Sequence, residues 1–200
     1  MKNDNRPLDA KIITLGDSKV GKSSLIIKFI DNKFSSNYLS TVGFDLKHKS
    51  IKLQNGEDIK LVIHDTAGEE RFKSLSTNYI KKANGVLLVY DITLKESFIN
   101  ITNWMNDIVE EAGNKVPIVL VGNKSDLKKE RIVSKEEGKK MAKQYNLQFF
   151  ETSAKDGTNV EKCFLEIAQQ IIEKKSQRKM SISNNKLLKK QKNDKNKKCC

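Results

Sequence analysis

Short runs that are apolar at most positions alternate along the chain with longer segments whose apolar residues are three or four apart. The runs occupy residues 11–15, 85–91, 117–121 and 147–150. A run that is apolar on both faces is typical of a central strand in a parallel sheet. Apolar residues three or four apart instead form one face of a helix. The alternation predicts an α/β fold, a mostly parallel sheet covered by helices on both sides.

Helices are predicted between these strands. An apolar helix is expected over residues 24–30, and two later stripes have helical spacing. They consist of Phe98, Ile101, Met105 and Ile108, and of Val160, Cys163, Phe164, Ile167 and Ile171. We assign them to core packing, since none needs a cofactor. Three helices are expected to begin with a capping box, a Ser or Thr three residues before a Glu. These pairs are Thr93/Glu96, Ser134/Glu137 and Thr158/Glu161.

Residues 44–63 show a different pattern. Ile59, Leu61 and Ile63 alternate with residues of the opposite face, and Asn55-Gly56 precedes them. Asn-Gly between two extended segments is a hairpin signal, so residues 44–53 and 59–63 are predicted to be antiparallel strands. Residues 32–41 are expected to form a long loop, and residues 69–82 a polar helix or mobile segment.

Charge divides the chain into unequal parts. The 200 residues carry a formal net charge of +13, with 37% hydrophobic and 32% charged residues. Residues 175–200 contain ten Lys or Arg and one acid, a net of +9, which leaves +4 for the rest. No apolar run is long enough to span a bilayer, and the first residues do not resemble a signal peptide. We expect a disordered leader over 1–9, one domain over 10–174, and a disordered basic tail over 175–200.

Candidate chemistry begins directly after the first predicted strand. Residues 16–23 are Gly-Asp-Ser-Lys-Val-Gly-Lys-Ser, the G-x-x-x-x-G-K-S pattern of a phosphate-binding loop. Glycines allow successive backbone N–H groups to point at anionic oxygens. Lys22 supplies a positive charge for the β- and γ-phosphates, and the Ser23 hydroxyl can ligate Mg²⁺. A helix beginning near Gly21 would add its N-terminal dipole.

Polar motifs end three other predicted strands. Asp65 begins Asp-Thr-Ala-Gly68 and can hold Mg²⁺, directly or through water. Asp126, in Asn-Lys-Ser-Asp over 123–126, offers two acceptors to the paired N–H donors of guanine, which adenine lacks. Ser-Ala-Lys at 153–155 can present a backbone N–H to guanine O6. Because ligands bind at the carboxyl ends of parallel strands, these motifs predict one guanine-nucleotide site.

In this order the motifs resemble those of the Ras-like small GTPases, specifically the Rab family, from about Lys11 to Lys174 and again at the terminus. Residues 41–45 (Thr-Val-Gly-Phe-Asp), 65–72 (Asp-Thr-Ala-Gly-Glu-Glu-Arg-Phe) and Tyr90-Asp91 add to the likeness. The resemblance implies the P-loop NTPase fold, with a six-stranded sheet, one antiparallel edge pair and five helices. The nucleotide-binding residues expected from motifs and resemblance are Ser18, Lys19, Val20, Gly21, Lys22, Ser23, Ser24, Phe34, Thr41, Gly68, Asn123, Lys124, Asp126, Ser153, Ala154 and Lys155.

The resemblance also implies a switch between GTP and GDP. Thr41 would reach Mg²⁺ with Ser23 and Asp65, and Thr41 and Gly68 would contact the γ-phosphate only in the GTP state. Phe34 would pack against the guanine. The implied partners are an exchange factor, a GTPase-activating protein that supplies an arginine finger, effectors, and a GDP dissociation inhibitor as prenyl-binding carrier. Effectors would contact Phe44, Leu46, His64 and Tyr79.

Four positions depart from the family pattern. Glu69 stands where Gln usually orients the attacking water beside catalytic Lys22. Either Glu69 slows intrinsic hydrolysis, or it is tolerated because an activating protein brings its own glutamine. Lys19 replaces a glycine and either points to solvent or contacts phosphate. Leu46 and His64 replace the usual Phe and Trp, and His64 is either a pH-sensitive partner contact or a half-exposed polar residue.

The chain ends in Cys199-Cys200, which resembles the doubly geranylgeranylated terminus of Rab proteins. Two lipid chains, or one with a basic segment, anchor stably. We therefore expect the cytoplasmic face of an intracellular or plasma membrane, with a carrier-bound cytosolic pool, a role in vesicle transport, and no specific nucleic-acid partner. One alternative is a GTP-binding scaffold with negligible turnover. A second is a P-loop ATPase or kinase with a nucleic-acid-binding tail, but the guanine-binding motifs and the terminal cysteines argue against it.

Overall fold

The structure is a computed structural model that describes residues 8–35, 44–53, 56–66, 73–113 and 116–196. Its centre is a six-stranded sheet with the order β2-β3-β1-β4-β5-β6. The strands are β1 (Leu8–Leu15), β2 (Phe44–Lys52), β3 (Asp58–Thr66), β4 (Gly85–Asp91), β5 (Ile118–Asn123) and β6 (Gln148–Glu151). The edge pair β2–β3 is antiparallel, and the other described pairs are parallel. The predicted fold class is confirmed.

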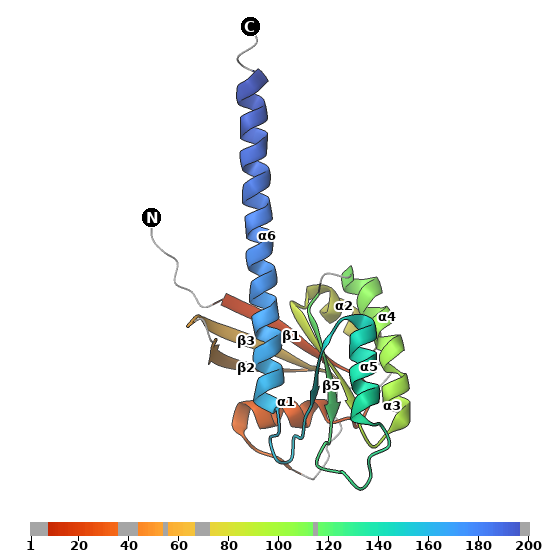
Figure 1. Ribbon diagram of the computed structural model, residues 1–200. Helices are drawn as coiled ribbons and strands as arrows, with labels where there is room; N and C mark the ends of the chain where they lie inside the picture. The colour runs from red at the N-terminus through yellow and green to blue at the C-terminus, as the bar shows by residue number, and fades with distance from the viewer. Residues whose placement is uncertain (1–7, 36–43, 54–55, 67–72, 114–115, 197–200) are drawn as a thin grey trace.

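Helices cover both faces of the sheet (Figure 1). They are α1 (Lys22–Asp31), α2 (Lys73–Lys82), α3 (Lys95–Ile99), α4 (Ile101–Ala112), α5 (Lys135–Tyr145) and α6 (Val160–Asn196). One apolar core lies under α1 and α6, where the Phe29 and Phe164 rings stack with centroids 4.1 Å apart. A second core lies under α2 to α5 and includes Tyr90 and Phe98. The predicted stripes therefore pack against the sheet, and the helix expected around Phe98 is divided at Asn100.

The alternation predicted for residues 59–64 is confirmed in β3. Ile59, Leu61 and Ile63 are buried, while the residues between them are exposed or half-buried. The hairpin turn closes through Gly56, whose φ is +84° and whose N–H donates to the Leu53 carbonyl at 2.9 Å. A positive φ suits glycine, which has no Cβ.

Both expected chain ends need correction. β1 begins at Leu8, because Leu8 and Asp9 pair with Ile59 and Lys60 of β3, and backbone pairing does not require apolar side chains. The tail expected to be disordered over 175–200 is helical as far as Asn196. Lys, Gln and Leu are good helix formers, and no Gly or Pro follows Gly157, so a helix started on the core can propagate outward. Figure 1 shows α6 extending well beyond the sheet. Among the described helices, none combines the length and apolar character needed to cross a bilayer.

Of the three predicted capping boxes, the one at Ser134 and Glu137 is confirmed at the start of α5. The helix after Thr93 begins one residue later, with Leu94 as its N-cap, and Thr93 bonds to Asp91 instead. α6 likewise begins one residue later than a box at Thr158 would require. At both positions an Asp two residues earlier accepts a hydrogen bond from the threonine backbone N–H.

Candidate nucleotide-binding site

The candidate site lies at the edge of the sheet where the parallel strands end. The loop between β1 and α1 occupies this edge, with the end of β3 and the segments that follow β5 and β6. Gly16 has a φ of +132°, and a Cβ there would lie 2.0 Å from the Val89 carbonyl oxygen of β4. Gly21 has a φ of +96°, and its Cβ would lie 2.4 Å from the Asn123 Nδ2 atom. Both glycines are therefore required by close packing as well as by conformation.

Lys22 begins α1, so the helix starts where the sequence predicts. Its side chain is buried, and its Nζ donates to the carbonyls of Gly16 and Asp17, both at 2.7 Å. Burial lowers the pKa of Lys22 to about 8, while Asp65 and Asp17 act in the opposite direction. Two neutral carbonyls thus hold the buried ammonium without neutralising its charge. An anion bound beside it would therefore be strongly stabilised.

Asp65, at the end of β3, has the surroundings expected of a cation ligand. Its side chain is buried, and burial raises its pKa, while a hydrogen bond from Ser23 and the charge of Lys22 oppose that shift. Its Oδ1 atom is buried and has no hydrogen-bond partner among the residues the structure describes. A buried carboxylate oxygen beside a hydroxyl oxygen matches the preference of Mg²⁺ for oxygen ligands. Ser23 and Asp65 therefore fit a Mg²⁺ site.

Asn123, the last residue of β5, connects the phosphate loop to the base-binding segments. Its Nδ2 donates to the Val20 carbonyl at 2.9 Å, and its Oδ1 accepts from the Thr152 hydroxyl at 3.2 Å. The Ser153 hydroxyl donates to Asp126 Oδ1 at 2.6 Å, which fixes that carboxylate. Residues from three separate motifs are thus hydrogen-bonded to one another.

Lys124 is held by a carboxylate from the neighbouring strand. Its φ is +66°, and its Nζ lies 2.6 Å from Oδ2 of Asp91, the last residue of β4. The Thr93 backbone N–H and hydroxyl both donate to the other oxygen of Asp91 at 2.8 Å. Because these hydrogen bonds fix the orientation of the Asp91 carboxylate, the carboxylate in turn fixes the position of the Lys124 ammonium.

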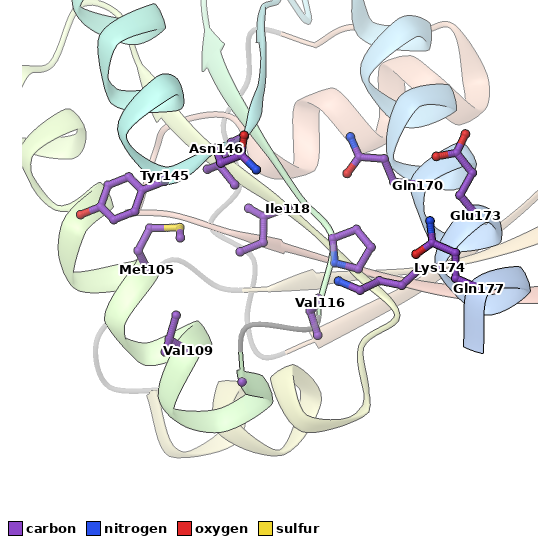
Figure 2. A pocket seen from close by; sticks show the side chains of 13 residues that line it. Met105, Val109, Val116, Ile118, Tyr145, Asn146, Gln170, Glu173, Lys174 and Gln177 are labelled. Atoms are coloured by element: carbon purple, nitrogen blue, oxygen red, sulfur yellow. The ribbon is translucent and has the colours of Figure 1, made fainter. Parts of the chain in front are cut away.

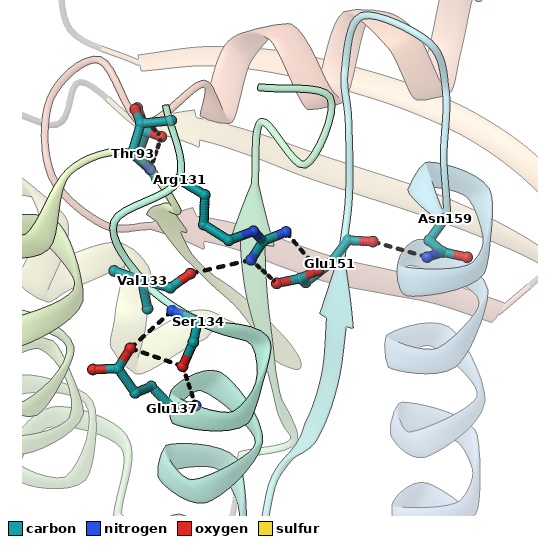
Figure 3. Close-up of polar contacts among 8 residues, drawn as sticks. Thr93, Arg131, Val133, Ser134, Glu137, Glu151 and Asn159 are labelled. Carbon is teal, nitrogen blue, oxygen red and sulfur yellow. Dashed lines mark hydrogen bonds and ion pairs between the residues drawn. The ribbon is translucent and has the colours of Figure 1, made fainter. Parts of the chain in front are cut away.

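An ion pair holds Glu151, the residue that precedes the segment at 152–155 (Figure 3). Arg131 donates to both carboxylate oxygens of Glu151, at 2.6 and 3.0 Å, and to the Val133 carbonyl at 3.1 Å. Asn159, just before α6, donates to the Glu151 carbonyl at 2.8 Å. The end of β6 is therefore anchored on two sides.

The remaining predicted residues are placed as follows. Ser18 and Ser24 are half-buried, Val20, Ser153 and Ala154 are buried, and Lys19 and Lys155 are exposed. Phe34 is 43% exposed. Lys19 adopts a φ of +63°. Thr41, Gly68, Glu69, Cys199 and Cys200 lie outside the described residues.

The residues expected to contact effectors lie on the edge pair and α2. Phe44 begins β2, and exposed Leu46 pairs with His64 across the two strands. The His64 and Tyr79 rings lie 5.0 Å apart. Burial lowers the pKa of His64, as does the charge of Lys11. The structure thus brings three of the four residues to one surface.

Sequence reasoning missed several supporting residues. Asp17, Asp91 and Thr152 bond directly to predicted site residues, yet no role was assigned to them. For Asp91 a signal existed, since it is a carboxylate ending an apolar strand at the same sheet edge. For Asp17 the side-chain partners are Trp104 of α4 and Asn100, the residue before α4, and no local pattern points to them.

A separate hollow of about 440 Å³ lies at the opposite end of the sheet, between α4, α5 and α6 (Figure 2). Its lining includes Met105, Val109, Tyr145 and Lys174 and none of the predicted site residues. The candidate site and this hollow are therefore distinct.

Comparison with known proteins gives a consistent result. A family model described as Ras family matches residues 11–173. The Ras-related protein Rab-8B of Pongo abelii is 47% identical over 174 residues, 87% of this chain and 83% of that protein. The Ras-related protein RIC1 of Oryza sativa subsp. japonica is 47% identical over 161 residues, 80% of this chain and 79% of that protein. The Ras-related protein Rab-13 of Canis lupus familiaris is 45% identical over 173 residues, 86% of this chain and 85% of that protein.

Proposed function

The chain belongs to the Rab branch of the Ras family, and we propose that it works as a membrane-anchored GTP/GDP switch in vesicle transport. As a member of this family it is a GTP hydrolase. The observation that carries the proposal is the hydrogen-bonded connection through Asn123, which holds the phosphate loop and the base-binding segments as one site.

Guanine selection follows from the base-binding segments. The Asp126 carboxylate is oriented by the Ser153 hydroxyl at 2.6 Å. Guanine offers it two parallel N–H donors, whereas adenine would leave a carboxylate oxygen unpaired, and such a mismatch is strongly rejected. Lys124, held by Asp91, would lie along the base, and exposed Phe34 would pack against the base.

Lys22 carries the electrostatic part of catalysis. Its ammonium is pre-positioned by two carbonyls, so it can meet charge that develops on the transferring phosphoryl group without reorganising. Ser23 and Asp65 would hold Mg²⁺, and a bound Mg²⁺ would neutralise phosphate charge. In the proposed switch, Thr41 and Gly68 engage the γ-phosphate and are released after hydrolysis. Exchange factors, activating proteins and effectors would recognise the difference between the two states.

We further propose that Glu69 slows intrinsic hydrolysis. A carboxylate beside the γ-phosphate is repelled and has no amide N–H with which to orient water. Single-turnover hydrolysis by the purified protein, beside Glu69→Gln, tests this. A wild-type rate below the order of 10⁻⁴ s⁻¹ usual without an activator, with a faster variant, supports the proposal. Equal rates at that order contradict it, and no hydrolysis by either protein favours the scaffold with negligible turnover.

Anchoring is proposed to depend on Cys199 and Cys200, joined to the domain by a basic segment. The described apolar packing of α6 ends at Ile172, and Met180 is 70% exposed, which supports a division near Lys174. Each Lys near an anionic leaflet adds at most about 1 kcal/mol, so lipid chains are needed for stable anchoring. After prenylation, the wild type should pellet with anionic vesicles and Cys199→Ser/Cys200→Ser should stay in solution. Equal pelleting would contradict lipid anchoring.

A further inference from the structure

Asp17, the second residue of the phosphate loop, is bonded on both sides. Its backbone carbonyl accepts from Lys22 Nζ at 2.7 Å. Its carboxylate turns the other way, where Oδ2 accepts from Asn100 Nδ2 and Oδ1 from Trp104 Nε1, both at 2.8 Å. The residue that helps to hold the phosphate-binding lysine is therefore itself held from α4 and the residue before it.

Core packing of α4 holds both donors in place. Asn100 joins α3 to α4, and the Trp104 backbone N–H donates to the Asn100 carbonyl at 3.1 Å. Ile101 and Met105, on either side of Trp104, are buried in the second core, and the half-buried indole packs against that core. Neither donor can move far without disturbing the packing of α4.

The orientation of the Asp17 carboxylate has an electrostatic consequence. Asp17 is close enough to Lys22 for its charge to raise the pKa of the lysine. A carboxylate free to rotate toward Lys22 would compete with phosphate for the ammonium and would repel the incoming anion. Hydrogen bonds to a charged group are the stronger kind, and two of them keep this carboxylate away from the site.

We propose that Asn100 and Trp104 are positioning residues that act on bound GDP and GTP through Asp17. By holding the Asp17 carboxylate they keep Lys22 available to the phosphates, and so they slow nucleotide release. The inference rests on the proposed nucleotide site and extends it to α4, a helix that lies outside the nucleotide-binding motifs in the sequence.

The test is the release rate of a fluorescent GDP analogue after addition of excess GDP in the presence of Mg²⁺. Trp104→Phe keeps an aromatic ring for packing but removes the N–H donor, and Asn100→Ala removes the other donor. We expect each to release the analogue about ten-fold faster, as is typical when an outer residue that orients a ligand-binding group is removed. Thr102→Ala, at an exposed position on α4, should release it at the wild-type rate.

A second arm separates positioning from simple loss of packing. In an Asp17→Ala background there is no carboxylate to hold, so adding Trp104→Phe should leave the release rate unchanged. A purely structural role predicts an equal further increase in that background, which would overturn the proposal. Without nucleotide, in EDTA, the melting temperatures of the variants should lie close to that of the wild type. With GDP bound, the variants should melt further below the wild type.

Nucleotide content of the purified wild type is measured first. If the wild type binds guanine nucleotide but Trp104→Phe and Asn100→Ala release it at the wild-type rate, the positioning role is wrong and the proposed function stands. If the wild type binds no guanine nucleotide, the proposed function and this inference are both wrong.

Discussion

Replacing Asn123 with alanine removes the side chain that connects the phosphate loop to the base-binding segments. Two hydrogen bonds are lost, one to the Val20 carbonyl at 2.9 Å and one from the Thr152 hydroxyl at 3.2 Å. Val20 and Thr152 are both 0% exposed and Asn123 is 1% exposed, so water cannot replace the missing partner. The substitution therefore leaves two buried polar groups unpaired.

The expected loss of stability follows from these two groups. An unpaired buried polar group costs about 1–3 kcal/mol, so we expect Asn123→Ala to lower the free energy of unfolding by about 3 kcal/mol. For a chain of this size each kcal/mol shifts the melting temperature by about 2–4 °C, which predicts a decrease of about 6–12 °C. Asn123→Asp keeps the acceptor for Thr152 but points an oxygen at the Val20 carbonyl, so its melting temperature should be at least as low.

Thermal unfolding followed by circular dichroism, in EDTA and again with GDP and Mg²⁺, measures this effect. Asn106→Ala, at an exposed position on α4, is the matched control and should melt with the wild type. The loss should be larger with GDP, because the substitution also separates the two halves of the site. A melting temperature of Asn123→Ala within about 2 °C of the wild type in both conditions would refute the connecting role.

Three further predictions concern the supporting structure. Gly138→Ala should destabilise by at least about 1 kcal/mol in urea unfolding despite alanine's helix propensity, because its Cβ would lie 2.6 Å from the Tyr90 hydroxyl oxygen. Tyr90→Phe should recover part of that loss, since this hydroxyl has no hydrogen-bond partner within the described ranges. Hydrogen bonds from Lys95 and Ser134 lower the pKa of Glu137 to about 2 in the folded state, so Glu137→Gln should cost stability above the unfolded pKa of about 4.5. That cost should shrink as the pH falls from about 4.5 toward about 2, as urea midpoints across this range will show. Arg131→Met should lower the unfolding free energy by about 2–3 kcal/mol because it leaves the 11%-exposed Glu151 side chain unpaired, whereas Arg131→Met/Glu151→Gln should regain part of it in the same urea assay.

The sequence predicted those features that depend on local chemistry. Apolar runs identified the central strands because a strand buried on both faces has no polar position to interrupt it. Lys22, Asp65 and Asn123 were found because each stands at a fixed place relative to a strand end. The sheet then brings these ends together whatever the connecting segments contain.

Contacts between distant segments could not be predicted in the same way. Trp104 and Asp17 are 87 residues apart, and their hydrogen bond depends on how α4 packs against the second core. The length of α6 was missed for a different reason. Beyond Ile172 the helix has no apolar stripe, so the period that identifies an amphipathic helix is absent, and only residue propensity favours the helix.

The central claim is that this site binds guanine nucleotide with Mg²⁺, and competition for a bound fluorescent GDP analogue tests it most directly. We predict that excess GTP or GDP displaces the analogue, that the same concentration of ATP does not, and that EDTA accelerates displacement by removing the cation held at Ser23 and Asp65. Displacement by ATP as readily as by GTP would contradict the role of Asp126, and a rate unaffected by EDTA would contradict the Mg²⁺ site.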